Sequence, residues 1–500
     1  MIRLLLPVAA VLGAAVCGWA IPGAKPVRPY TFHHENVLGT SLELKVLAAT
    51  EAQALLAEAA ALEEIDRCAQ ILSAWDHSSE FSRWMRTRNT PERVSPELFE
   101  VLRLFSEWRD RTGGALDPAA EVVTRLWKSA AALNRLPSES ELRDAAAMVR
   151  QTHYRLDAAA RTATRLTGAP LALNSFAKSY IVAKAADAAL RAADASGVML
   201  DIGGDLVVRG DMEDAVSIRD PRDDAENGIA LDRIQVRDRA VATSGSYRRG
   251  FDIGGRHYSH IVDPRTAQPV DHVISSTVVA QDAATAGALA TAFSVMEPAA
   301  SARLASATRG VEFLLAKSDG TRLASPGWAA LALPRLAYGG VLPLFAPSPF
   351  EVVIQLELAR VEDRRYRRPY VAVWVEDKDR FPVRTLALWY EKPRWLPDLK
   401  SWSRSDRLRS LAEGTDLTAT VSSATRPPGK YTLKWDGNDN AGKPVKPGRY
   451  TVFIEAAREH GTYQMMRQEI DLGAAPAKVD LPANDEVAGA VIEVRKANGR

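Results

Sequence analysis

Residues suited to acid–base and phosphate chemistry gather in the segment 244–269 of this 500-residue chain. It reads SGSYRRG and then HYSHIVDPRTAQP, with His260, Asp263 and Arg265 among several hydroxyl groups. A histidine among hydroxyl groups could take part in proton transfer near pH 7. Taken alone, however, a single histidine is more often structural than catalytic, and an Asp-Pro step also suits a type I turn.

Three earlier segments hold a glycine pair or the start of a helix, and each could bind an anion. They are TGGALDPAAEVVTRLW (112–127), LALNSFAKSYIV (171–182) and LDIGGDL (200–206). Glycine pairs let the backbone approach a ligand, and a helix N-terminus binds phosphate through its free amides, to which Lys178 would add charge. Glycine pairs also make ordinary turns, and a helical lysine is usually solvated. No segment has the spacing of a P-loop, a dinucleotide-binding fingerprint or a zinc site.

The elements that must position these residues mix helices and strands. Apolar periodicity predicts helices over 51–72, 96–112, 175–193 and 284–296, and a buried strand over 198–202 that stops at a glycine pair. Helices and strands do not alternate regularly, which favours an α+β domain over a doubly wound sheet. We expect this domain to span residues 21–341.

The pattern changes after a proline-rich linker at 342–350. Alternating apolar residues predict strands near 352–358, 370–375, 386–390, 431–435 and 450–454, and residues 436–448 resemble a hairpin loop. Residues 351–500 are therefore expected to form an all-β immunoglobulin-like sandwich whose tryptophans pack its core.

The N-terminus predicts export. Residues 1–20 have a basic start, an apolar run and small residues before a cleavage point after Ala20, which is typical of a signal peptide, with an uncleaved membrane anchor as the alternative. The mature chain would then be periplasmic and hold one cysteine, Cys68, expected to be buried and inert. A net charge of +2 with interspersed acids and bases argues against a nucleic-acid partner.

Together and in order, these segments resemble the ApbE family of FAD:protein FMN transferases. The likeness runs from Thr31 to Pro298 and is carried by VLGTSLEL, LSAWDHSSEFSRW, GGALDPAAEVVTRLW, NSFAKSYIV, IGGDL, SGSYRR, SHIVDPRTAQP and ALATAF. The resemblance implies an exported enzyme that binds FAD with Mg²⁺ at the pyrophosphate. FMN would pass to a threonine or serine hydroxyl of an exported or membrane redox protein, and AMP would leave.

The resemblance also implies roles for individual residues. Those expected to line the FAD site are Leu38, Trp75, Ala115, Leu116, Asp117, Lys178 and Ile261. The Ser175 carbonyl and the Thr291 hydroxyl fall where the metal is held. His260 falls where a base would take the proton of the acceptor hydroxyl.

The chain departs from the family pattern at positions that matter for the metal. Gly287 stands where the family has an aspartate, Ala172 replaces an aspartate before the lysine-bearing helix, and Ser179 and Ala267 replace glycines. Mg²⁺ prefers carboxylate oxygens. Substitute carboxylates could come from Asp201, Asp205 or Asp282. Two alternatives therefore stand beside the transferase: a catalytically impaired protein that binds or delivers FAD, and a scaffold whose sandwich docks a partner.

The C-terminal half resembles a domain of unknown function that often accompanies ApbE proteins. Within it, TVSSAT (420–425) is an imperfect version of the flavin-acceptor motif, which makes Thr425 a hypothetical self-acceptor. A simple turn before Pro427 is the favoured alternative.

Overall fold

The computed structural model describes residues 26–228, 230–246, 249–333, 350–361, 366–415, 417, 421–473 and 475–496. The expected signal peptide at 1–20 lies outside the described residues, as does the expected linker apart from Phe350. Among the described residues, no helix is long and apolar enough to cross a membrane.

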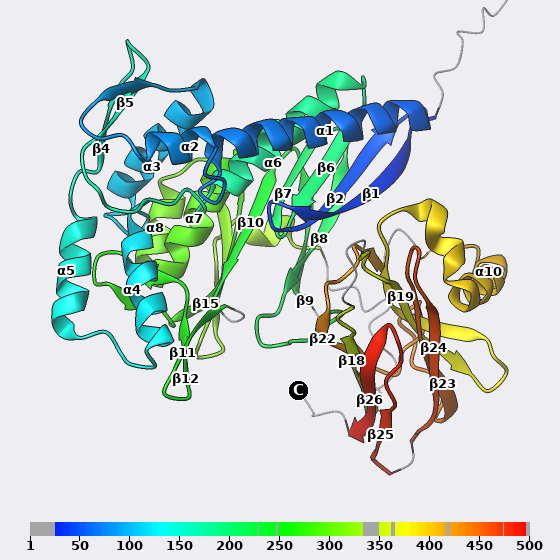
Figure 1. Cartoon of the computed structure of the whole chain (residues 1–500). Coiled ribbons are helices and arrows are strands. Elements are labelled where there is room, and N and C mark those ends of the chain that lie inside the picture. The colour runs from blue at the N-terminus through cyan, green and yellow to red at the C-terminus, as the bar shows by residue number, and fades with distance from the viewer. Residues whose placement is uncertain are drawn as a thin grey trace, which may run out of the picture.

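The larger unit is built on an eight-stranded sheet with the order β1-β2-β6-β7-β10-β15-β16-β17 (Figure 1). All neighbouring strands in it are antiparallel. The strands are β1 Arg28–Val37, β2 Thr40–Ala48, β6 Gly197–Ile202, β7 Asp205–Gly210, β10 Ala240–Gly245, β15 Val273–Ala280, β16 Glu312–Lys317 and β17 Arg322–Ala324. This confirms the predicted α+β class, because helices and antiparallel strands are mixed without a βαβ alternation.

Helices cover one face of this sheet, and α1 lies along α6 above it (Figure 1). The helices of the larger unit are α1 Glu51–Leu72, α2 Glu80–Trp84, α3 Pro96–Arg111, α4 Ala120–Ala132, α5 Glu139–Val149, α6 Ala177–Ala192, α7 Ala283–Val295, α8 Pro298–Ser306 and α9 Trp328–Leu331. The four helices expected from periodicity are present as α1, α3, α6 and α7. Cys68 is fully buried on α1, and burial raises the pKa of its thiol to about 12, as expected for an inert cysteine.

Smaller elements complete the larger unit. A second core, which includes Met199, Val208 and Trp328, packs strands β8 and β9 and helix α9 against sheet strands. The remaining strands are β3 Pro91–Arg93, β4 Tyr154–Asp157, β5 Thr162–Arg165, β8 Glu213–Arg219, β9 Ala230–Arg237, β11 Gly250–Ile253, β12 Arg256–Ser259, β13 Val262–Asp263 and β14 Gln268–Pro269.

The smaller unit is strand-rich. One sheet has the order β22-β18-β26-β25, the other the order β21-β20-β19-β23-β24, and apolar side chains from both form one core. The strands are β18 Phe350–Leu358, β19 Tyr370–Asp377, β20 Pro382–Trp389, β21 Ser422–Ser423, β22 Gly429–Trp435, β23 Gly448–Ala457, β24 Tyr463–Leu472, β25 Ala477–Leu481 and β26 Val487–Lys496. Trp374, Trp389, Trp402 and Trp435 are buried as expected, whereas Trp395 is exposed.

Two expectations for this unit were wrong. It is not all-β, because the chain forms a 3-10 helix at Pro393–Asp398 and α10 at Lys400–Glu413. Segment 436–448 does not close a hairpin either, because β22 and β23 belong to different sheets. The helix α10 has only Trp402 and Arg409 buried, so it lacks the apolar repeat by which helices are found in a sequence.

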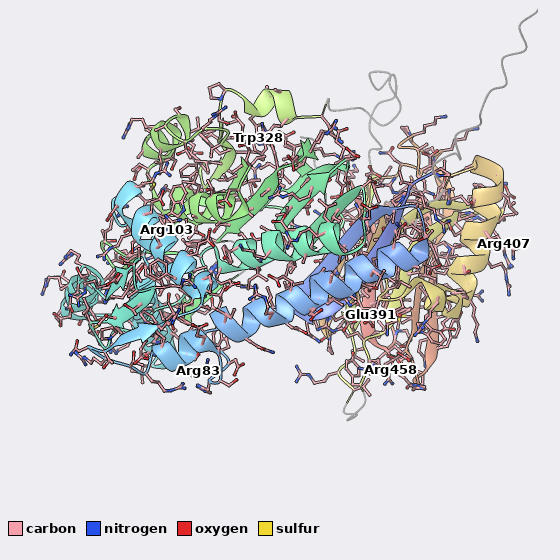
Figure 2. The ribbon with its side chains drawn as sticks, turned by 90° about the horizontal axis from the view of Figure 1, so that it is seen from above. Arg83, Arg103, Trp328, Glu391, Arg407 and Arg458 are labelled. Carbon is pink, nitrogen blue, oxygen red and sulfur yellow. The ribbon has the colours of Figure 1, made fainter. Side chains whose placement is uncertain are left out.

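Polar contacts join the two units. Lys434 Nζ lies 2.7 Å from Asp223 Oδ1, and the Glu226 amide donates to the Thr432 carbonyl at 2.7 Å. Figure 2 shows the labelled Glu391 on the side of the smaller unit that meets the larger one, and Arg407 of α10 on the far side.

Candidate functional site

Lys178 stands in the first turn of α6. The residue before this helix, Phe176, makes no side-chain cap, so the first amides of the helix have no side-chain acceptor. Lys178 Nζ donates to the Gly203 carbonyl at 3.1 Å and lies 3.2 Å from Asp205 Oδ2. A cation and a helix N-terminus therefore meet at the β6–β7 turn, as phosphate binding requires.

The β6–β7 turn is a two-residue hairpin made by Gly203 and Gly204. Both have positive φ, 58° and 91°, which side chains adopt only with strain. Asp201 Oδ1 accepts the Gly204 amide at 2.9 Å. Burial raises the pKa of Asp201 to about 6, and it also raises the pKa of Asp205, against the nearby Lys178. The turn therefore holds two carboxylates in a poorly hydrated place.

The β1–β2 turn packs against this hairpin. A Cβ atom added to Gly203 would lie 2.6 Å from Thr40 Cγ2, so the two turns touch. Leu38, two residues earlier, has φ of 49° and is half-buried. Leu38 therefore lies in the β1–β2 turn, which contacts Gly203, the residue whose carbonyl accepts a hydrogen bond from Lys178.

Thr291 and Ser175 meet between α7 and the start of α6. Thr291 Oγ1 donates to the Ser175 carbonyl at 3.0 Å. Gly287, one turn earlier on α7, faces Phe176 and Ser179. Two oxygens expected at a metal are therefore adjacent, although no group of three or more His, Cys, Asp or Glu side chains in the described part of the chain could hold an ion.

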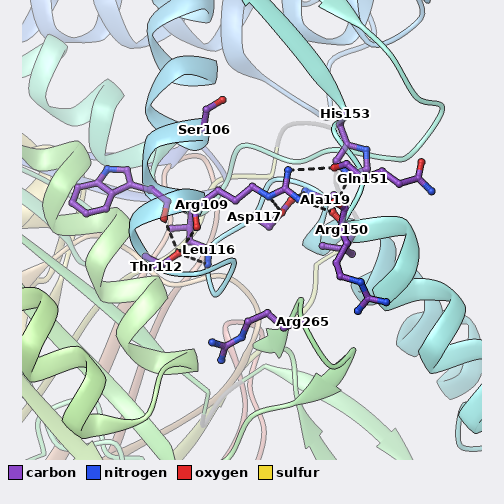
Figure 3. A network of polar contacts seen from close by, with 12 residues as sticks. Ser106, Arg109, Thr112, Leu116, Asp117, Ala119, Arg150, Gln151, His153 and Arg265 are labelled. Carbon is purple, nitrogen blue, oxygen red and sulfur yellow. Dashed lines mark hydrogen bonds and ion pairs between the residues drawn. The ribbon is translucent and has the colours of Figure 1, made fainter.

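The turn after α3 is held by buried polar contacts (Figure 3). Asp117 Oδ2 lies 2.8 Å from Arg109 Nε, and Asp117 Oδ1 accepts the Ala119 amide at 2.7 Å. Burial raises the pKa of Asp117 to about 6, although both partners lower it. Ala115 and Leu116 belong to the core, so a ligand could use mainly their backbone.

A pocket of 390 Å³ opens beside this turn. Its lining includes Arg109, Arg150 and Arg265 together with Gly113 and Gly114. Figure 3 shows Arg265 across from the chain segment that carries Asp117. Asp110 and Asp117 also line the pocket, and Arg109 and Arg265 are each paired with an aspartate, so the lining carries charges of both signs.

Backbone bonds connect this turn to the rest of the site. The Ala172 amide donates to the Pro118 carbonyl at 2.8 Å, which ties the turn to the segment leading into α6. The Val270 amide donates to the Ile261 carbonyl at 2.9 Å, and Ile261 is buried. The first bond joins segments more than fifty residues apart in the chain, whereas the second closes the local hairpin of β13 and β14.

His260 follows β12. Its Nδ1 lies 3.0 Å from the Arg249 carbonyl, which can only accept, so Nδ1 carries the hydrogen and Nε2 is left as an acceptor. Burial lowers the pKa of His260; the hydrogen bond to the Arg249 carbonyl opposes this, and the charges of Arg249 and His257 add to the lowering. A neutral imidazole with a free Nε2 has the state that a general base needs.

Trp75 is another residue expected at the FAD site. Its side chain is 85% exposed in the turn after α1. Within the described residues, no hydrogen bond or ring contact joins this side chain to them.

Comparison with known proteins identifies the larger unit. The pattern of the ApbE family matches residues 38–315, more than half of the chain. The chain belongs to the ApbE family. A second pattern, described as a predicted periplasmic protein (DUF2271), matches residues 351–489.

Curated relatives of the ApbE domain carry one name, FAD:protein FMN transferase. The Treponema pallidum protein is 29% identical over 341 residues, which cover 63% of this chain and 92% of that protein. The Klebsiella pneumoniae protein is 27% identical over 308 residues, which cover 58% of this chain and 86% of that protein. A crystal structure of the ApbE protein from Thermotoga maritima superposes with a TM-score of 0.55 at 27% identity, covering 61% of this chain and all of that one.

Sequence reasoning missed two features of the ApbE domain. The Arg109–Asp117 pair escaped notice because Arg109 lies on a helical face with no motif of its own. The contact between Ser179 and Gly287 joins two residues that the sequence marked only as separate departures from the family.

Proposed function

We propose that this chain is a FAD:protein FMN transferase that modifies a threonine or serine of an exported or membrane redox protein. The observation that carries the proposal is the junction of Lys178, the start of α6 and the β6–β7 turn inside a domain that matches the ApbE family over 38–315. A cation at a helix N-terminus suits the pyrophosphate of FAD.

The reaction exchanges one phosphorus–oxygen bond for another. The acceptor oxygen attacks the phosphorus on the FMN side of FAD, a phosphoester bond forms, and the bond to the AMP phosphate breaks. The acceptor loses its proton and AMP leaves with the bridging oxygen. Phosphoryl transfer depends mainly on positioning and on neutralising negative charge.

In this proposal Lys178 and the N-terminus of α6 hold the phosphates, and His260 Nε2 receives the acceptor proton. The flavin and adenosine are lined by Leu38, Ala115, Leu116, Asp117 and Ile261, and the exposed ring of Trp75 is available to stack on flavin. The pocket beside Gly114, lined by charges of both signs, offers room for part of a ligand near that turn.

Mg²⁺, when bound, would supply positive charge against the pyrophosphate. The Ser175 carbonyl and the Thr291 hydroxyl would hold it, and their closeness supports this. Lys178, His260 and Thr291 are the residues that the ApbE resemblance implies at these positions. Their presence favours a transferase over an impaired FAD-binding protein.

We also propose the setting of the enzyme. Residues 1–20 direct export to the periplasm, residues 21–341 form the transferase, residues 342–350 link it, and residues 351–500 form an immunoglobulin-like sandwich. The match of 351–489 to a predicted periplasmic protein supports this compartment, and the two sheets with one shared core support the sandwich.

Intact-mass measurement on residues 21–500, incubated with FAD, Mg²⁺ and a peptide bearing the family's acceptor motif, tests the function. We expect an FMN-sized increment on the peptide that is lost in His260→Ala. Bound FAD without any increment would contradict the transferase and favour FAD binding or delivery.

A further inference from the structure

Helices α6 and α7 approach each other closely at Ser179 and Gly287. A Cβ atom added to Gly287 would lie 2.2 Å from Ser179 Oγ, 3.0 Å from Ser179 Cβ and 3.1 Å from Phe176 Cβ. Non-bonded atoms do not come this close, so no side chain fits at 287 while Ser179 keeps its place. The Ser179 hydroxyl therefore occupies the space in which a side chain at 287 would begin.

The Ser179 hydroxyl is buried without a satisfactory partner. The residue is 3% exposed, and its Oγ makes no hydrogen bond of ordinary geometry within the described residues. It lies close enough to Asp205 to lower the pKa of that carboxyl group. The hydroxyl can turn its hydrogen toward Asp205, and the lone pairs of its oxygen then remain available to a ligand.

The Ser179 hydroxyl meets α7 at position 287, one turn before Thr291, a residue expected at a metal. Residues 287 and 291 are one turn apart on the same face of α7, and Thr291 Oγ1 donates to the Ser175 carbonyl at 3.0 Å. Hard divalent cations take hydroxyl, carbonyl and carboxylate oxygens. The surroundings of Ser179 therefore fit such an ion.

The nearby carboxylates can be told apart. Asp282 caps α7 through the Thr285 amide at 2.6 Å, and Asp201 accepts the Gly204 amide. Asp205 is paired with Lys178 and is the carboxylate that Ser179 influences.

We propose that Ser179 and Gly287 are a matched pair, in which the Ser179 hydroxyl, backed by Asp205, replaces the carboxylate that the ApbE pattern has at 287 as an oxygen donor to a divalent cation. The pair relocates the donor from α7 to α6. The inference rests on the proposed function for the identity of the site, but not on FMN transfer itself.

Binding of Mn²⁺ to the FAD-loaded protein, followed by the electron paramagnetic resonance of free Mn²⁺, tests the donor. We expect Ser179→Ala to weaken Mn²⁺ binding about tenfold or more with little change in the unfolding temperature, because the hydroxyl makes no hydrogen bond of ordinary geometry among the described residues. Ser294→Ala is the matched control, since that buried hydroxyl bonds within α7 to the Ala290 carbonyl. Unchanged Mn²⁺ affinity in Ser179→Ala, or no binding to the unmodified protein, would overturn the donor role.

A double-mutant cycle tests the pairing. We expect Gly287→Asp alone to lower the unfolding temperature. The double variant with Ser179→Gly should regain the parent's unfolding temperature and still bind Mn²⁺. Ser179→Gly alone measures how much a glycine in the helix destabilises the protein. A Gly287→Asp variant that is as stable as the parent would refute the pair. If these Mn²⁺-binding and stability results are obtained but no FMN is transferred, the proposed transferase function is rejected and the Ser179–Gly287 proposal stands.

Discussion

Asn227 and Lys434 exchange two hydrogen bonds across the junction of the two units. The Asn227 amide nitrogen donates to the Lys434 carbonyl, and the Lys434 amide donates to Asn227 Oδ1, each at 2.8 Å. Next to them, the Glu226 amide donates to Thr432. The segment therefore pairs with β22, which is an edge strand of its sheet, and covers polar groups that an edge otherwise exposes.

Asn227→Ala should loosen this junction. It leaves one amide and one carbonyl of β22 without partners, for which we expect a loss of about 1–3 kcal/mol and faster proteolysis between the units. Thermal unfolding and limited proteolysis measure this. Gln468→Ala is the control, because the Gln468 side chain donates to the carbonyl of the adjacent Glu469 on β24 and not to the junction. Equal behaviour of the two variants would show that the junction does not depend on this pairing.

His33 should make folding sensitive to mild acid. It is 2% exposed, lies edge-on to the Tyr390 ring at 5.1 Å, and its pKa is lowered from 6.5 to about 4 by burial and by Lys45, His34 and Arg426. The folded state thus binds fewer protons between pH 4 and 6.5. Its stability is full above pH 6.5 and falls toward pH 4, by up to about 3 kcal/mol. His33→Phe should flatten this loss in denaturant titrations.

Glu35 provides a control of opposite sign. Burial raises its pKa to about 7, against the attraction of Arg368. The folded state therefore binds more protons between pH 4.5 and 7, and this stabilisation is lost as the pH rises through that window. The Glu35→Gln variant should become more stable relative to the parent as the pH rises from 4.5 to 7. If its relative stability instead increased as the pH fell, the raised pKa of Glu35 would be contradicted.

Lys178→Met should weaken FAD binding. Loss of a charge-assisted contact of about 1.5–3 kcal/mol corresponds to roughly 10- to 150-fold in Kd, measurable by quenching of flavin fluorescence. Lys184→Met is the control on the same helix, where the ammonium group lies 5.1 Å from the Tyr180 ring centroid. Similar affinities for the two variants would remove Lys178 from the phosphate site.

Thr425 should not carry flavin. Its residue is 1% exposed, and its hydroxyl has no partner among the described residues, so FAD cannot reach it in this fold. Thr425→Val should therefore change stability by less than about 1 kcal/mol, because it replaces an unpaired hydroxyl by a methyl group, and leave any covalent flavin in place. Loss of such a label, seen by intact mass, would instead support self-modification.

The sequence by itself determined the local elements and the segments of the site. Helix α1 begins and ends where periodicity predicts, with Thr50 as its N-cap, and the glycine pair after β6 makes the expected turn. Such features depend on residues close in the chain, and their side chains carry the signal. For the same reason, the polar helix α10, with few buried side chains, left no pattern to find.

Only the tertiary structure decided which distant residues touch. It sent β22 and β23 into different sheets, although their sequences suggested a hairpin. It also set Ser179 against Gly287, which turns two separate departures into one arrangement. Contacts between residues about a hundred positions apart depend on how helices pack on a shared sheet, and local propensity does not encode that packing.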